Sequence, residues 1–137
     1  MANEFGNNIQ DALVNPAAFA MGAASASTTS AVIDLGVDTY KHGNVEFELA
    51  VPALATGVIP DASLVSLILE TSTTSNFAAI VGTYTETVTG AGGVGIAATV
   101  ARFRLPSNAP RYARFKTTRG AGGTTAAAFN ATGTVRF

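Results

Sequence analysis

The chain has 137 residues and a formal net charge of −1, which fits one domain and gives no bulk attraction to nucleic acid or anionic membranes. It contains no cysteine and a single histidine, His42, so disulfides, thiol catalysis, cysteine-ligated metals and sites built from several imidazoles are excluded. Alanine, threonine and glycine dominate and tryptophan is absent, a composition that suits thin β-sheets better than a deep aromatic pocket.

Residues 1–27 differ from the rest of the chain and predict an N-terminal arm. A polar run is followed by alanine-rich sequence that contains Pro16. Alanine favours helix, but a proline limits any helix to short pieces, so we expect an extended or partly helical arm, either docked on the domain or ordered on a partner. Residues 12–33 carry no charge, yet they are too polar for a membrane-spanning helix, and no basic segment typical of a signal peptide precedes them. We therefore expect a chain made in the cytoplasm and not exported.

From residue 28 onward the pattern predicts β-strands. Residues 44–51 alternate most clearly, with apolar side chains at every second position and Glu46 and Glu48 between them. Residues 111–118 place Ala113 and Phe115 inward in the same way. The expected strands are 28–35, 44–51, 63–71, 77–88, 96–105, 111–118, and one or two strands within 124–137 that break near Gly133.

Glycines and prolines separate these strands and favour an all-β fold. Seven or eight short strands with turn signals between them are typical of an antiparallel β-sandwich or barrel. We expect an antiparallel β-sandwich over residues 28–137, with a jelly roll as the first choice and an immunoglobulin-like sandwich as the second.

The motifs that could carry chemistry have simpler structural explanations. The run 90–95 loosely resembles a phosphate-binding loop, but a strand follows it where a helix is required, so we expect a flexible hairpin loop. Residues 120–123 predict a second loop of this kind, and both could be mobile tips at one end of the sandwich. His42 lies between two predicted strands without a nucleophile motif nearby, which indicates an exposed loop histidine. Glu46 and Glu48 share one strand face, the expected solvent pattern. We expect no enzyme, no metal and no cofactor.

Charge is segregated along the chain. All nine acidic residues lie at or before Glu86, and seven of the eight basic residues lie at or after Arg102. Two interpretations follow for the cations. They pair with glutamates of neighbouring strands, where each exposed pair contributes only about 0.2–1 kcal/mol, or they bind carboxylates of another protein. The cations are Arg102, Arg104, Arg114 and Lys116, and the candidate partners within the sheet are Glu46, Glu48, Glu70 and Glu86.

Several short segments carry a resemblance to a known family through their order and spacing. In chain order they are Thr-Ser-Ala-Val-Ile-Asp-Leu-Gly (29–36), Leu-Ile-Leu-Glu-Thr-Ser (67–72), Asn-Phe (76–77), Arg-Leu-Pro (104–106), Arg-Tyr-Ala-Arg-Phe (111–115) and the glycine-rich turn 120–123. This series resembles the small jelly-roll cement, or decoration, proteins of tailed bacteriophage capsids, over roughly residues 28–137. The chain departs from that family in its long N-terminal segment and in Ala113, where a larger aliphatic residue is common.

The resemblance implies a virion protein that is made in the bacterial cytoplasm and binds the outside of the capsid, where it ties neighbouring capsomers together. Its partners would be the major capsid protein and copies of itself, as a dimer or a trimer, with no nucleic acid and no membrane. The candidate contacts are Phe5, Ile9, Leu13 and Phe19 in the arm and Arg102, Arg104, Arg114 and Lys116 in the sandwich. The alternative is a carbohydrate-binding sandwich module on a virion or secreted surface, with a shallow site built from Tyr40, Tyr84 and Tyr112.

Overall fold

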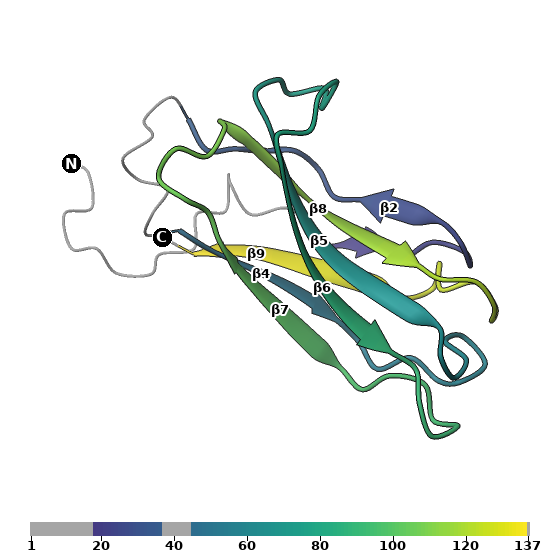
Figure 1. Cartoon of the computed structure of the whole chain (residues 1–137). Coiled ribbons are helices and arrows are strands. Elements are labelled where there is room, and N and C mark those ends of the chain that lie inside the picture. Colours follow the sequence, from purple (N-terminus) through teal and green to yellow (C-terminus); the bar gives the residue numbers. More distant parts are fainter. Residues whose placement is uncertain (1–17, 37–44, 137) are drawn as a thin grey trace.

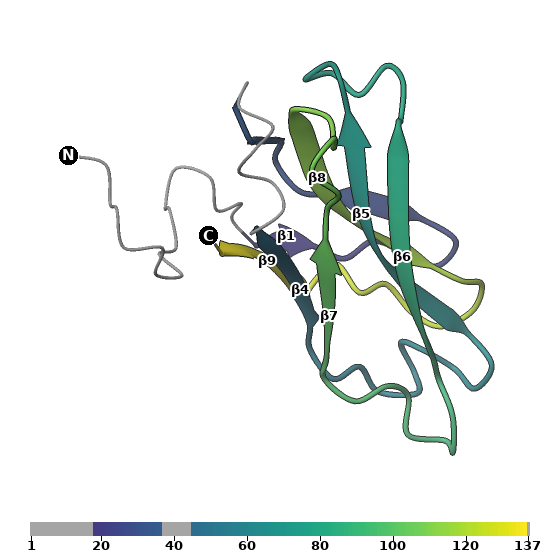
Figure 2. The ribbon, with the colours of Figure 1, turned by 60° about the vertical axis from the view of Figure 1, so that its left-hand side comes forward.

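Nine β-strands in two layers make up the part of the chain that the computed structural model describes, residues 18–36 and 45–136 (Figures 1 and 2). The expected antiparallel β-sandwich is confirmed, and the described residues contain no helix. The strands are β1 (Phe19–Ala20), β2 (Ser27–Thr29), β3 (Ile33–Asp34), β4 (Glu46–Val51), β5 (Leu64–Ser72), β6 (Gly82–Thr89), β7 (Thr99–Arg104), β8 (Tyr112–Arg119) and β9 (Asn130–Arg136).

Sheet I has the order β1-β9-β4-β7, and sheet II has the order β2-β8-β5-β6. Strand β3 also pairs with β8, in line with β2, so that β2 and β3 together fill one strand position at the edge of sheet II. If β2 and β3 are taken as this one strand, every connection crosses from one sheet to the other except the connection from β5 to β6, which stays within sheet II. This is the strand order of a jelly roll, the first choice of the sequence analysis.

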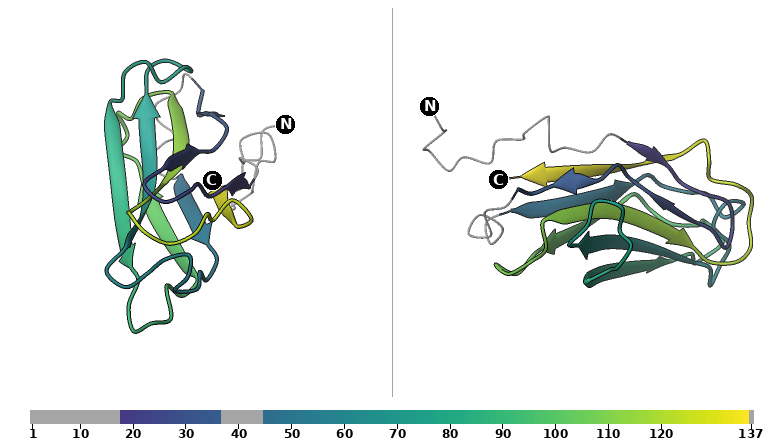
Figure 3. Two further views of the ribbon diagram at one scale, coloured as in Figure 1. Left: turned by 90° about the vertical axis from the view of Figure 1, so that its right-hand side faces the viewer. Right: turned by 90° about the horizontal axis from the view of Figure 1, so that it is seen from above.

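The core lies between the two sheets, which Figure 3 shows from the side and from above. Every second residue of β4 is buried, as its alternation predicts, and the same holds for Val65, Leu67 and Leu69 in β5. At the centre the rings of Phe47 and Phe115 meet edge to face, with their centroids 6.2 Å apart. The predicted inward positions Ala113 and Phe115 are both fully buried.

Residues 18–27, which the sequence analysis assigned to the arm, belong to the sandwich. Strand β1 pairs with β9 through Phe19 opposite Ala131, and Met21 is fully buried in the core. A strand of two residues has too short a pattern to show a period, which explains why the sequence did not reveal it. The candidate contacts Phe5, Ile9 and Leu13 lie outside the described residues.

Three predicted strands have different limits in the structure. The expected strand 28–35 is interrupted because the Ser30 side-chain oxygen accepts the Phe115 N–H, at 3.0 Å, in place of a main-chain carbonyl. The expected strand 77–88 begins only at Gly82, because residues 73–81 form a loop. The expected break near Gly133 is absent, since Gly133 lies opposite Leu49 and the ladder continues beyond it.

The two glycine-rich loops lie at the same end of the sandwich, but they are docked rather than free tips. Both contact the β4–β5 connection, residues 52–63. A Cβ atom at Gly95 would stand 2.0 Å from the Leu54 carbonyl oxygen, and one at Gly123 would stand 2.1 Å from that of Val58. Both glycines have positive φ, so no other residue fits either position without strain. The Asp61 carboxylate also accepts the Gly93 N–H at 2.9 Å.

Arg119 fastens this end of the sandwich from inside. Its side chain is only 2% exposed, and its guanidinium donates to the Gly22 carbonyl at 2.8 Å and to the Val58 carbonyl. The main-chain N–H of Arg119 donates to the Ala26 carbonyl at 3.0 Å. No carboxylate neutralises it among the described residues, and burial lowers the pKa of the guanidinium from its usual value. Arg119 therefore joins β8 to the β1–β2 turn and to the β4–β5 connection.

We predict that Arg119→Ala lowers the free energy of unfolding by about 3–5 kcal/mol, because it opens a cavity, removes the guanidinium donor from the Val58 carbonyl and leaves the Gly22 carbonyl with only the Ala126 N–H, at 3.3 Å. Arg104→Ala is the matched control, since its exposed side chain contributes no more than about 1 kcal/mol. Urea unfolding of the two variants measures the difference. Equal losses would show that the buried guanidinium does not fasten the loops.

Candidate functional site

The outer face of sheet I carries a continuous series of ion pairs, the Arg–Glu chain, formed by Arg136, Glu48, Arg102, Glu46 and Arg104. Glu48 accepts from Arg136 at 3.2 Å and from Arg102 at 3.0 Å, and Glu46 contacts Arg102 at 3.7 Å and Arg104 at 3.1 Å. The register produces this series, because the central strand β4 supplies both glutamates and its neighbours β7 and β9 supply the arginines.

The Arg–Glu chain has one positive charge in excess, since three arginines share two glutamates. The side chains of Arg102 and Arg104 are 64% and 75% exposed, whereas that of Glu48 is 15% exposed. A hydrogen bond from Arg102 is the largest contribution that lowers the pKa of Glu48, so this carboxylate stays charged. The cationic groups therefore face solvent, with guanidinium donors left over for another protein.

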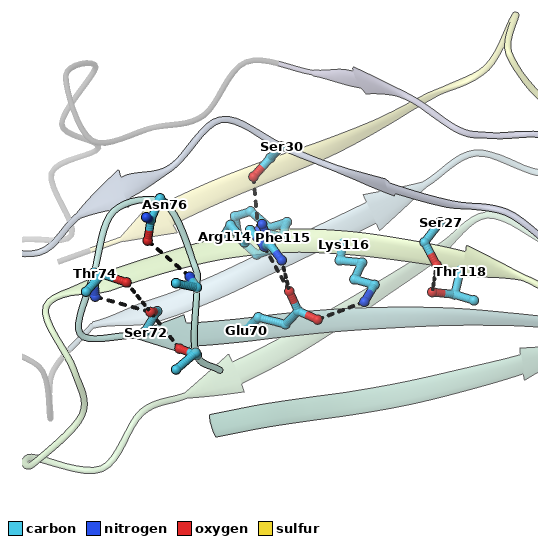
Figure 4. Close-up of polar contacts among 12 residues, drawn as sticks. Ser27, Ser30, Glu70, Ser72, Thr74, Asn76, Arg114, Phe115, Lys116 and Thr118 are labelled. Atoms are coloured by element: carbon cyan, nitrogen blue, oxygen red, sulfur yellow. Dashed lines mark hydrogen bonds and ion pairs between the residues drawn. The ribbon is translucent and has the colours of Figure 1, made fainter. Parts of the chain in front are cut away.

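The outer face of sheet II carries a more enclosed cluster around Glu70. Its side chain is only 6% exposed, and its carboxylate lies between Arg114, at 2.7 Å, and Lys116, at 2.8 Å (Figure 4). Burial alone would raise the pKa of Glu70, but the hydrogen bonds and charges of Lys116 and Arg114 outweigh burial and lower it. The guanidinium of Arg114 also stacks on the ring of Phe77, 4.2 Å from its centroid.

The loop that carries Phe77 is held in place by its own side chains (Figure 4). Ser72 donates its hydroxyl to the Ala79 carbonyl at 2.8 Å and accepts the Thr74 N–H at 3.2 Å. The Asn76 side chain accepts the Ala78 N–H at 3.1 Å, a turn that asparagine commonly makes. The loop therefore covers one end of the Glu70 cluster and leaves little of its charge exposed.

The structure places the predicted cations on two opposite faces. Arg102 and Arg104 lie on sheet I, and Arg114 and Lys116 lie on sheet II, so these four cations do not form one surface. All four pair with glutamates, as the first interpretation of the sequence proposed. The fourth candidate acid, Glu86, has no ion pair among the described residues; it lies on β6 opposite Leu67, on the core side of sheet II.

Phe19, the candidate contact of the arm that the structure describes, is half-buried against the core.

Sequence reasoning missed one strong ion pair, between Asp34 and Arg111. The two side chains form two parallel hydrogen bonds of 2.7 Å between β3 and the start of β8. Arg111 and the Gly36 N–H together lower the pKa of Asp34 to about 2. The Asp-x-Gly turn was visible in the sequence, but its partner becomes evident only once β3 is paired with β8.

The tyrosines do not form one platform. Tyr84 of β6 lies opposite Leu69 and packs against the core, whereas Tyr112 of β8 shares the outer side of sheet II with Arg114. Tyr40 lies outside the described residues, as does His42.

Within the described ranges, no group of three or more acidic, histidine or cysteine side chains is placed to hold a metal ion. None of the described segments is a helix that is long and apolar enough to cross a membrane. Comparison with models of known protein families and with curated proteins finds no match to this chain. The geometry of the two outer faces is therefore the main guide to function.

We predict that acid destabilises the fold between about pH 4.5 and about pH 2. Asp34, Glu48 and Glu70 all have lowered pKa values in the folded chain, so their contribution is complete above their ordinary pKa values of 3.8 and 4.5 and is lost as the pH falls through the folded values. Urea unfolding across this range measures the effect. Glu70→Gln should flatten the dependence, while Glu86→Gln, which removes no ion pair among the described residues, should leave it steep. An unchanged slope in Glu70→Gln would contradict the assignment.

Proposed function

We propose that this protein is a non-enzymatic structural protein that binds the outer surface of a tailed-phage capsid and cements neighbouring capsomers. It acts there as a small homo-oligomer with the major capsid protein as its partner. The proposal rests on the resemblance of the segments and on the character of the exposed faces. Its location would be the exterior of the virion.

The arrangement of the resembling segments supports the proposal. Residues 29–36 run from the last residue of β2 through β3, residues 67–72 lie in β5, and residues 111–115 include the first four residues of β8. These strands are neighbours in sheet II, although the segments are far apart in the sequence. Three of the six resembling segments therefore lie side by side in one sheet, whereas the segment 104–106 begins at the end of β7 in sheet I.

The exposed Arg–Glu chain is the observation that carries the proposal. It is a regular strand surface whose excess charge is presented by the planar donors of arginine, which bind carboxylates in a defined orientation. Each exposed contact contributes only about 0.2–1 kcal/mol. A capsid repeats the same contact many times, and an oligomer that binds through several copies gains avidity from such weak contacts.

We predict that the double variant Arg102→Gln/Arg104→Gln raises the dissociation constant for capsid shells by roughly tenfold or more, because two exposed contacts are lost. Its stability should change by no more than about 2 kcal/mol, about 1 kcal/mol for each exposed arginine. The measurement is co-sedimentation with shells of the major capsid protein from the same genome, at low and high salt. Arg111→Gln is the control, since its guanidinium is engaged by Asp34. Wild-type protein that does not bind the shells at all would overturn the proposed function, whereas equal binding by all three proteins would overturn the role of the Arg–Glu chain.

The N-terminal arm is tested by removing residues 2–16 only, because a longer deletion would remove Phe19 and the buried Met21 from the sandwich. We predict that this truncated protein keeps the melting temperature of the full chain and occupies fewer sites on the shells, as measured by cryo-electron microscopy. Full occupancy would show that the arm makes no capsid contact.

The alternative, a carbohydrate-binding module, has less support. A sugar site of this kind needs aromatic rings side by side, and Tyr84 and Tyr112 are on different sides of sheet II. A glycan array with the full chain distinguishes the two functions.

A further inference from the structure

Strand β6 forms a long edge of sheet II. It pairs with β5 over eight consecutive residue pairs, from Gly82 opposite Thr71 to Thr89 opposite Leu64, and it ends the strand order of the sheet. An edge strand directs half of its main-chain N–H and C=O groups away from the sheet, where a further strand can bind them. Within the described part of the chain, no other strand covers this side of β6 (Figure 2).

The other edges of the described sheets are less suited to pairing. Strand β1 has two residues, and the edge formed by β2 and β3 is interrupted between residues 29 and 33. Strand β7 is shorter than β6, and it carries the exposed cations Arg102 and Arg104. Natural proteins protect edges by shortness, interruption and charge, and these three edges show such protection. Strand β6 has neither proline nor lysine and no interruption.

The side chains of β6 favour a strand neighbour. Its outward positions Thr83, Thr85, Thr87 and Thr89 are all threonines and all exposed. Threonine has a high strand propensity, and threonines that face one another across strands stabilise the pair by about 0.2–1 kcal/mol. The core-side positions are Gly82, Tyr84, Glu86 and Val88, so a glycine at the start of the strand and one charge are the elements that discourage pairing.

We propose that β6 pairs with β6 of a second copy of this chain, antiparallel about a two-fold axis at Thr85, and so joins the two copies of sheet II into one sheet. With this two-fold axis, the outer faces of the two copies of sheet II lie on the same side of the joined sheet. The reason is that antiparallel strands related in this way place outward residues opposite outward residues. The residue on the axis then lies opposite the same residue of the second copy.

The charge of Glu86 selects the register. An axis at Glu86 would place the two carboxylates directly opposite one another, which is destabilising. An axis at Thr87 would place Glu86 opposite the apolar Val88. An axis at Thr85 places Glu86 of each copy opposite the polar Tyr84 ring of the other, pairs Thr83 with Thr87, and uses nearly the whole length of β6. Of these three registers, the one at Thr85 combines matched side chains with a long interface.

This inference rests on the proposed self-association and names its surface, but its test uses purified protein without shells. If the protein does not bind capsid shells, the proposed β6–β6 dimer is unaffected. If the dimer does not form, the proposed capsid binding is unaffected.

The absence of cysteine in the chain makes disulfide cross-linking a direct test. Opposite residues of antiparallel strands have Cα atoms about 4.5–5.5 Å apart, within the range that a disulfide bridges. Thr85→Cys should therefore cross-link to itself under mild oxidation. Thr87→Cys, on the same face of the same strand, is the control, because two such residues would be about 14 Å apart along the strands. A mixture of Thr83→Cys and Thr87→Cys should cross-link only to each other.

Analytical ultracentrifugation of the full chain gives the second measurement. We expect a dimer for the wild-type protein and at least a tenfold rise in the dimer dissociation constant for Thr85→Lys, since two like charges then meet at the axis. Thr132→Lys, on the outer face of β9, should leave the dimer unchanged, and circular dichroism should show that all variants are folded. A monomeric or trimeric wild-type protein, or self-cross-linking of Thr87→Cys equal to that of Thr85→Cys, would overturn the inference.

Discussion

The register between β5 and β8 is the constraint on which the rest of the molecule depends. Eight consecutive pairs join these central strands, and each pair assigns one side chain to the core or to the outside. Phe115 enters the core beside Leu69, while Arg114 meets Glu70 on the outer face. A slip of one residue would turn Arg114 and Lys116 into the core and move Phe115 to the surface. Hydrophobic burial and ion pairing therefore select the same register.

The sequence predicted what is local and missed what depends on pairing. Alternation identified the strands and the inward residues of β4, β5 and β8, because a period of two is visible within one strand. The placement of Phe19 and Met21 in the sandwich depends on β9, more than a hundred residues away, and no local pattern encodes it. The limits of β6 were misjudged because Phe77 looks like a strand residue, whereas it covers Arg114 in a loop.

The candidate site shows the same division. Glutamate partners for the four cations were proposed from residue type, and the structure bears three of them out. Which of these cations share a face could not be known before the strands were assigned to sheets. Arg119 was not among the candidate cations, and it is buried, because the odd-numbered residues of β8 point inward and the loops around it supply carbonyl acceptors.

The pairing of β1 with β9 has a consequence for how the chain matures. The first described strand completes sheet I only beside the last described one, so Phe19 cannot reach Ala131 until the chain has been synthesised through β9. Such long-range contacts make folding slow and leave early segments exposed during translation. The apolar side chain of Met21, which is buried in the folded core, stays exposed on the nascent chain during that interval. Closure of the jelly roll is thus a late step, because sheet I is complete only when β9 is available to pair with β1.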